Sequence, residues 1–158
     1  MKKKHPSFST SPQPPHSVTS IHTLRNPMTI AQEDGYLPYF IFFTALMATL
    51  HSVICYASPR TSLKPFSGPS SPPHTPLLAH LYGVLNITIG AIRAYAAWEI
   101  RNKALYDLAL GTYVGVIWLL GSEVVVGRTV RVGDAAVPLG VTVVGLGWMV
   151  GARGAYVG

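Results

Sequence analysis

Five polar or ionisable residues lie in the most apolar part of the chain, where such side chains need partners. They are His80, Asn86, Arg93, Asp107 and Glu123, all between positions 77 and 126. Charged groups inside a bilayer are costly unless they are paired, so each marks a structural contact or a functional site. A histidine beside a carboxylate could move a proton, whereas an arginine beside a carboxylate would form an ion pair. Asn86 is expected to hydrogen-bond a neighbouring helix.

These residues lie on two apolar stretches joined by a short basic turn, Arg101-Asn102-Lys103. A bilayer core about 30 Å thick needs about 20 apolar residues in a helix. The stretches 77–100 and 104–126 are both long enough. So short a connection predicts two antiparallel helices that lie side by side.

Counting from the turn gives the depth of each residue in this hairpin. Residues equally far from position 102 on the two antiparallel helices lie at about the same depth. Residue 93 is then level with 111, and residue 123 is level with 81. Glu123 then lies near the depth of His80, and Arg93 lies roughly 6 Å deeper than Asp107, within reach of its long side chain. We therefore predict two structural contacts across the hairpin, Glu123–His80 and Arg93–Asp107.

The composition of the whole chain is that of a membrane protein. Of its 158 residues 49% are hydrophobic and only 11% are charged, against about 25% charged in soluble domains. The pattern predicts an all-α membrane protein, a bundle of four transmembrane helices behind a disordered Pro/Ser-rich tail at 1–36. Within this tail, residues 1–27 are predicted to be either dispensable or an extension that is not part of the natural protein. The predicted spans are 37–57, 77–100, 104–126 and 135–152.

The net charge of +6 does not indicate nucleic-acid binding, because the basic residues flank the apolar blocks. Such positions suit lipid headgroups and membrane topology. The basic loop residues expected at the interface are Arg101, Lys103, Arg128 and Arg131. Basic residues near the spans are equally shared between the two sides, and only those at positions 2–4 favour cytosolic termini.

Two pairs of glycines are spaced for close helix packing. Gly111 and Gly115 lie in the third predicted span, and Gly147 and Gly151 lie in the fourth. Small residues four apart let helix backbones approach one another, and they often mediate association. These faces are candidate docking surfaces for partner proteins or for a second copy of the chain.

The sequence carries no recognisable catalytic or metal-binding motif. Its six histidines lack metal-ligand spacing, and Cys55 is the single cysteine. We therefore expect neither an enzyme nor a bound cofactor.

Read together, the hairpin and its surroundings carry a specific combination of short motifs. They are Gly83, Ile92-Arg93 with Tyr95, Asn102 before Leu105-Tyr106, Thr112-Tyr113, Ser122-Glu123 and Trp148-Met149. Over roughly residues 36–152 the chain resembles the ergosterol-biosynthesis scaffold family, small endoplasmic-reticulum membrane proteins of fungi and animals. It departs from the family at His80, where arginine is expected, and at Leu85-Asn86, where Trp-Thr is expected.

The resemblance implies a non-catalytic tether in the endoplasmic-reticulum membrane. Its implied partners are the enzymes of sterol C-4 demethylation, namely the C-4 methyl oxidase, the 3β-hydroxysteroid dehydrogenase/decarboxylase and the 3-keto sterol reductase. Two alternatives stay open from the residues alone. One is a small sterol-modifying enzyme, such as an isomerase that uses His80 and Glu123. The other is a small transporter or channel with Arg93 and Asp107 lining its path.

Overall fold

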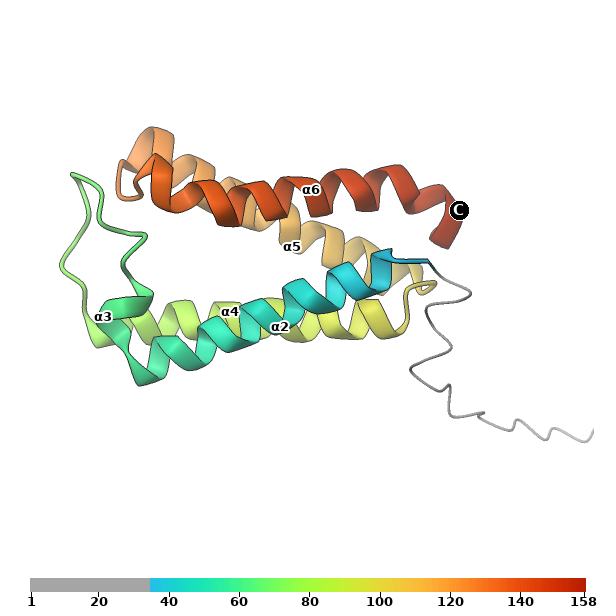
Figure 1. Ribbon diagram of the computed structural model, residues 1–158, viewed down its shortest axis with the longest axis horizontal. Helices are drawn as coiled ribbons and strands as arrows, with labels where there is room; N and C mark the ends of the chain where they lie inside the picture. Colours follow the sequence, from blue (N-terminus) through green and yellow to red (C-terminus); the bar gives the residue numbers. More distant parts are fainter. Residues whose placement is uncertain (1–34) are drawn as a thin grey trace, which may run out of the picture.

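The computed structural model describes residues 35–158, and the regular elements in this range are all helical (Figure 1). Four of its helices are long and apolar enough to cross a membrane. They are α2 (Leu37–Ala57), α4 (Pro76–Trp98), α5 (Lys103–Ser122) and α6 (Val132–Val157). A π-helical turn, η1 (Glu123–Gly127), continues α5, and the short helix α3 (Pro59–Ser62) follows α2. The chain is therefore an all-α, multi-pass membrane protein, as predicted.

The predicted spans differ from the helices mainly at the C-terminal end. The first span coincides with α2, whereas α6 has 26 residues and extends beyond the predicted 135–152 at both ends. Arg153, which ends the apolar run, lies inside α6 and binds the carboxylate of Asp107 on α5. The predicted tail lies almost wholly outside the described residues.

Side-chain caps fix where the two central helices begin. The Thr75 hydroxyl accepts a hydrogen bond from the Leu78 amide at 3.3 Å at the start of α4. The Asn102 side chain accepts from the amides of Ala104 and Leu105 at the start of α5. These bonds satisfy amides that have no partner inside a helix. Asn102 thereby defines the tight turn between α4 and α5.

The four long helices form two antiparallel pairs. Helix α2 packs chiefly against α4, and α5 packs chiefly against α6. The pairs approach one another at the end that holds the C-terminus, and they separate at the opposite end, where the loop 63–75 lies (Figure 1). Helices α4 and α5 are antiparallel as predicted, but they do not lie side by side along their whole length. The main neighbour of α4 is α2.

The hydrophobic core sits at the end where the pairs converge. Its buried members come from the start of α2, the end of α4, the start of α5, the second half of α6 and the turn after α4. They are Leu37, Ile41, Ala96, Ala97, Ile100, Tyr106, Ala109, Tyr113 and Met149. Tyr106 also donates a hydrogen bond to the Met149 carbonyl at 2.5 Å, which ties α5 to α6.

Close helix contacts inside the chain rest on glycines other than those predicted. A Cβ atom on Gly90 would lie 2.6 Å from Thr49 Oγ1, and one on Gly145 would lie 2.6 Å from the Tyr113 ring. Gly83 similarly makes room for Tyr56. A Cβ atom on any of the four predicted glycines would meet nothing within 4 Å. These are Gly111, Gly115, Gly147 and Gly151.

Candidate functional site

A buried arginine lies where the two helix pairs meet. Arg93 on α4 is 6% exposed, and its guanidinium carbon lies 3.7 Å from the centre of the Tyr113 ring on α5. Its Nε donates to the Thr112 hydroxyl at 2.9 Å. A cation over an aromatic face is attracted by the ring's negative surface, most strongly where water is excluded. The charge is thus held by an aromatic ring and a hydroxyl, and no carboxylate takes part in these contacts.

Tyr113 extends this network to the other two long helices. Its hydroxyl lies 2.6 Å from the hydroxyl of Thr44 on α2, and Thr44 donates its own hydrogen to the Ile41 carbonyl. The single Thr44 hydrogen is therefore engaged, so Tyr113 is the donor in the shared bond. Gly145 on α6 makes room for the Tyr113 ring. All four spans therefore meet around one side chain.

The predicted Arg93–Asp107 contact is wrong. Asp107 instead binds Arg153 of α6, with the closest oxygen and nitrogen 2.9 Å apart and both side chains partly exposed. The depth of Arg93 was predicted correctly, because Thr112 lies next to the level of position 111. The two residues differ in rotation about their helix axes, so Asp107 faces α6 while Arg93 faces Tyr113.

The predicted Glu123–His80 contact is also wrong. His80 stacks on Tyr56 of α2, with ring centres 4.6 Å apart, and Glu123 accepts a hydrogen bond from the Thr129 hydroxyl at 2.6 Å. His80 and Glu123 do not meet, because α4 and α5 have diverged at the end of the molecule that holds the loop 63–75. The pair that an isomerase would need is therefore not assembled.

Asn86 does not reach a neighbouring helix as predicted. Its side-chain amide donates to the Tyr82 carbonyl at 2.8 Å, one turn earlier on α4. A polar side chain in an apolar helix can satisfy itself on its own backbone in this way. The basic loop residues Arg101, Lys103, Arg128 and Arg131 are all exposed, as expected for interfacial positions.

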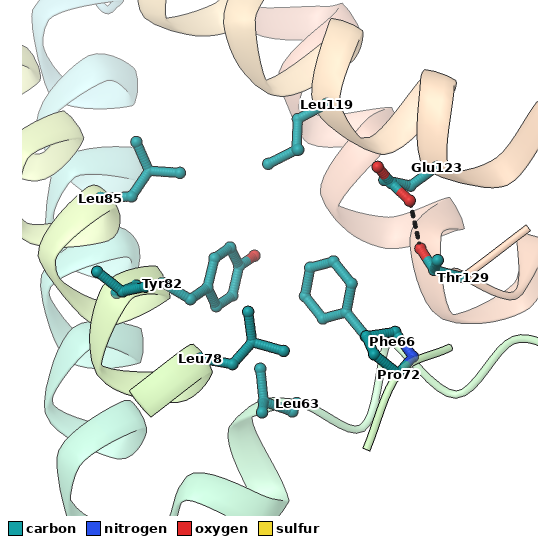
Figure 2. Close-up of a pocket in the computed structure, with 10 residues that line it drawn as sticks. Leu63, Phe66, Pro72, Leu78, Tyr82, Leu85, Leu119, Glu123 and Thr129 are labelled. Carbon is teal, nitrogen blue, oxygen red and sulfur yellow. Dashed lines mark hydrogen bonds between the residues drawn. The ribbon is translucent and has the colours of Figure 1, made fainter. Parts of the chain in front are cut away.

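Between the diverging helices lies an apolar cavity of about 360 Å³. Leu78, Tyr82 and Leu85 of α4 form one wall, and Leu119 and Glu123 of the other pair lie opposite (Figure 2). Phe66 and other residues of the 63–75 loop cover its end, and Phe66 meets the edge of the Tyr82 ring with ring centres 5.2 Å apart. Sequence reasoning missed this cavity, which depends on the angle between the helix pairs.

One end of the cavity is bounded by a direct connection between two loops. The Gly68 amide donates to the Thr129 carbonyl at 2.7 Å, and the Ser70 amide donates to the Arg128 carbonyl at 3.3 Å. A Cβ atom on Gly68 would collide with the Arg128 carbonyl oxygen, so this approach requires glycine. Arg128 itself adopts a left-handed conformation with φ 54°.

Neither region has the side chains of a metal centre. Within residues 35–158, no cluster of three or more histidine, cysteine or acidic side chains is arranged to hold a metal ion. The arginine network is built from groups that hold one another in place, whereas the cavity offers apolar walls and one carboxylate. The arginine network can fix the angle between the helix pairs, and the cavity can enclose an apolar molecule.

Comparison with known proteins gives one family. Residues 37–147 match the family described as Erg28 like protein. A curated relative from Saccharomyces cerevisiae, named Ergosterol biosynthetic protein 28, is 25% identical over 143 residues, which are 90% of this chain and 97% of that protein. The protein of the same name from Candida albicans is 28% identical over 117 residues, 73% of this chain and 83% of that protein.

No solved structure gives a significant match to the chain. The family match begins with the first residue of α2, takes in α4, α5 and η1, and ends inside α6. It therefore includes both the arginine network and the cavity. Because it covers well over half of the sequence, the chain belongs to the Erg28-like protein family.

Proposed function

We propose that this chain is a non-catalytic scaffold of the endoplasmic-reticulum membrane that acts in ergosterol biosynthesis. It would tether the C-4 methyl oxidase, the 3β-hydroxysteroid dehydrogenase/decarboxylase and the 3-keto sterol reductase of sterol C-4 demethylation. The names of both curated relatives support the pathway. Holding enzymes of successive steps together raises the effective concentration of each for the next without any new chemistry.

The observation that carries the tether proposal is the position of the open glycines. On α6, Gly147 and Gly151 lie on the face opposite Gly145 and Met149, which pack inside the chain. At 100° per residue the two sets are about half a turn apart. These glycines therefore face away from the protein's own helices.

Helix α5 has the same arrangement. Gly111 and Gly115 lie opposite the buried Tyr106 and Tyr113. A helix face made of glycine backbone makes few van der Waals contacts with acyl chains, whereas a second helix can pack closely against it. Both glycine faces are thus suited to the transmembrane helices of partner enzymes. The exposed basic loops at 101–103 and 128–131 would make further contacts at the membrane surface.

The test is an affinity purification from mild-detergent microsomes, combined with sterol analysis of a deletion strain that carries each variant. Gly147→Leu/Gly151→Leu and Gly111→Leu/Gly115→Leu block the two faces without an internal clash, because the space around them is empty. Gly121→Leu is the matched control, since Gly121 also has open space but lies off the α5 glycine face.

The proposal expects the wild type and Gly121→Leu to recover the three enzymes and to restore normal sterols. At least one blocked face should lose an enzyme, and C-4-methylated or 3-keto sterols should accumulate. If the wild type purifies without these enzymes and the deletion strain has normal sterols, the tether function is excluded. Recovery of a second tagged copy alone would indicate self-association instead.

A further inference from the structure

We propose that the cavity between α4 and the α5–η1 segment binds one neutral, rigid lipid with a single hydroxyl group, a sterol, whose hydroxyl donates to Glu123. The choice of a sterol among such lipids rests on the proposed role in ergosterol biosynthesis. The site itself follows from the shape and chemistry of the cavity. None of the four glycines Gly111, Gly115, Gly147 and Gly151 lines this cavity, so the proposal concerns a ligand and not the tethered enzymes.

The walls of the cavity suit a flat hydrocarbon. They are leucine side chains from three segments together with the rings of Phe66 and Tyr82. The volume of about 360 Å³ is near the lower end for ligand pockets, which range over about 300–1,000 Å³. One compact ring system fits this space better than the two acyl chains of a phospholipid. Leu81, which lines the cavity, is 60% exposed, so the cavity opens sideways to the surrounding lipid.

Glu123 gives the cavity a defined polar end. Its Oε2 accepts from the Thr129 hydroxyl, and the carboxylate lies against the bare backbone of Gly127, where a Cβ atom would collide with it. The backbone carbonyl of Glu123 also accepts from the Thr129 amide at 3.0 Å. A π-helical turn begins at this residue, and such turns are frequent at functional sites. The carboxylate is therefore held in place at the edge of an apolar cavity.

A fixed carboxylate selects the kind of lipid head that can bind. It attracts a hydroxyl donor and repels the phosphate of a phospholipid or the carboxylate of a fatty acid. Oε1 keeps acceptor capacity, because the Thr129 hydroxyl binds the other oxygen. Glu123 ends the α5 span, so the hydroxyl would lie near the membrane surface, where lipid hydroxyl groups lie.

The experiment measures binding of radiolabelled ergosterol to the purified full-length protein in detergent. Saturable binding is expected, and competition by unlabelled ergosterol should be at least about tenfold stronger than competition by ergosteryl acetate, which has no hydroxyl to donate. Excess phosphatidylcholine should compete poorly. Competition by phosphatidylcholine at equal concentration would overturn the proposal and indicate a general lipid groove.

Two variants distinguish the contribution of the apolar walls to sterol binding from that of the Glu123 carboxylate. Leu119→Trp should fill the cavity and abolish binding, whereas Leu108→Trp, in a shallow apolar groove on the other half of α5, should leave binding unchanged. Glu123→Gln keeps an acceptor for Thr129, and it should reduce the preference for ergosterol over its acetate several-fold. A thermal melt checks that each variant is folded.

Unaltered binding by folded Leu119→Trp would overturn the proposed location, and an unaltered preference in Glu123→Gln would overturn the role of the carboxylate. The measurement uses no partner enzyme. Failure to bind sterol would therefore leave the tether proposal standing, and loss of enzyme recovery would leave this site standing.

Discussion

Arg93 lies over the ring of Tyr113, with its guanidinium carbon 3.7 Å from the ring centre, at the point where all four spans meet. The pair joins α4 to α5, and the Tyr113 hydroxyl continues the connection to Thr44 of α2. An arginine within a span would otherwise be a liability. Here it fixes how the two helix pairs cross, and each member of the network can be tested separately.

Tyr113→Phe should cost little and Tyr113→Ala should cost much. The phenylalanine keeps the ring beneath Arg93 and loses only the hydrogen bond to Thr44, and such bonds between membrane helices are worth about 0.6 kcal/mol on average. The alanine also removes the ring and leaves a void, for which about 3–5 kcal/mol is expected. Equilibrium unfolding of the purified protein in mixed detergent micelles measures both. Equal losses for the two variants would show that the ring does not hold the arginine.

Gly145→Ala should destabilise the protein and Gly147→Ala should not, although the two positions lie two residues apart. A Cβ atom on Gly145 would lie 2.6 Å from the Tyr113 ring and 2.9 Å from the Phe40 ring, whereas one on Gly147 meets open space. Overpacking at position 145 should destabilise the protein by about 1–3 kcal/mol. Alanine at 147 should be neutral, or stabilising by up to about 1 kcal/mol through helix propensity. Thermal midpoints in detergent would reveal the contrast, and similar midpoints would contradict it.

Gly68→Ala should separate the two loops that bound one end of the cavity. The added methyl group has no room beside the Arg128 carbonyl, so the bonds from the amides of Gly68 and Ser70 should break together. Hydrogen exchange of peptides covering 66–72 should become faster, while exchange in the core at Tyr106 should not change. Gly133→Ala, in open space at the start of α6, is the control. Unchanged exchange at 66–72 would show that the loops are held by other contacts.

The Asp107–Arg153 pair should contribute modestly and should depend on salt. Both side chains are partly exposed, at 44% and 40%, and exposed pairs measured by double-mutant cycles are typically worth about 0.2–1 kcal/mol. The single changes Asp107→Asn and Arg153→Gln, with the double variant, isolate the coupling. It should shrink as ionic strength rises. A coupling that salt does not affect would mean that the pair is shielded from water.

The sequence was a good guide to the level of Arg93 along the helix axes and a poor guide to the rotation of residues about those axes. Span length and the tight turn at Asn102 were enough to predict four helices and the depth of Arg93. Which residue a side chain meets at that depth depends on the angle and rotation of packed helices, and these are set by contacts such as Tyr113 against Gly145. The pattern of apolar blocks does not contain that information. Both predicted contacts across the hairpin, Glu123–His80 and Arg93–Asp107, were wrong for this reason.

For the glycines, too, the sequence does not show which neighbour a helix face meets. Spacing marks Gly147 and Gly151 as a packing face, but it does not say whether the neighbour belongs to this chain or to another. Only the three-dimensional arrangement shows that the chain's own contacts use Gly83, Gly90 and Gly145. The Thr112-Tyr113 pair at the depth of Arg93 was the one signal from which the true arginine partners could have been found.

Because the hydrophobic core packs the two helix pairs together at one end, the distance between them at the other end depends on different contacts. The packed region around Tyr113 joins the pairs at one end, and among the described residues the far ends of the pairs contribute nothing to that core cluster. At that far end, two backbone hydrogen bonds join the proline- and serine-rich loop 63–75 to the segment that follows η1 in the opposite pair. The loop 63–75 therefore bridges the gap between the two pairs, and it helps to set the width of the cavity that it lines.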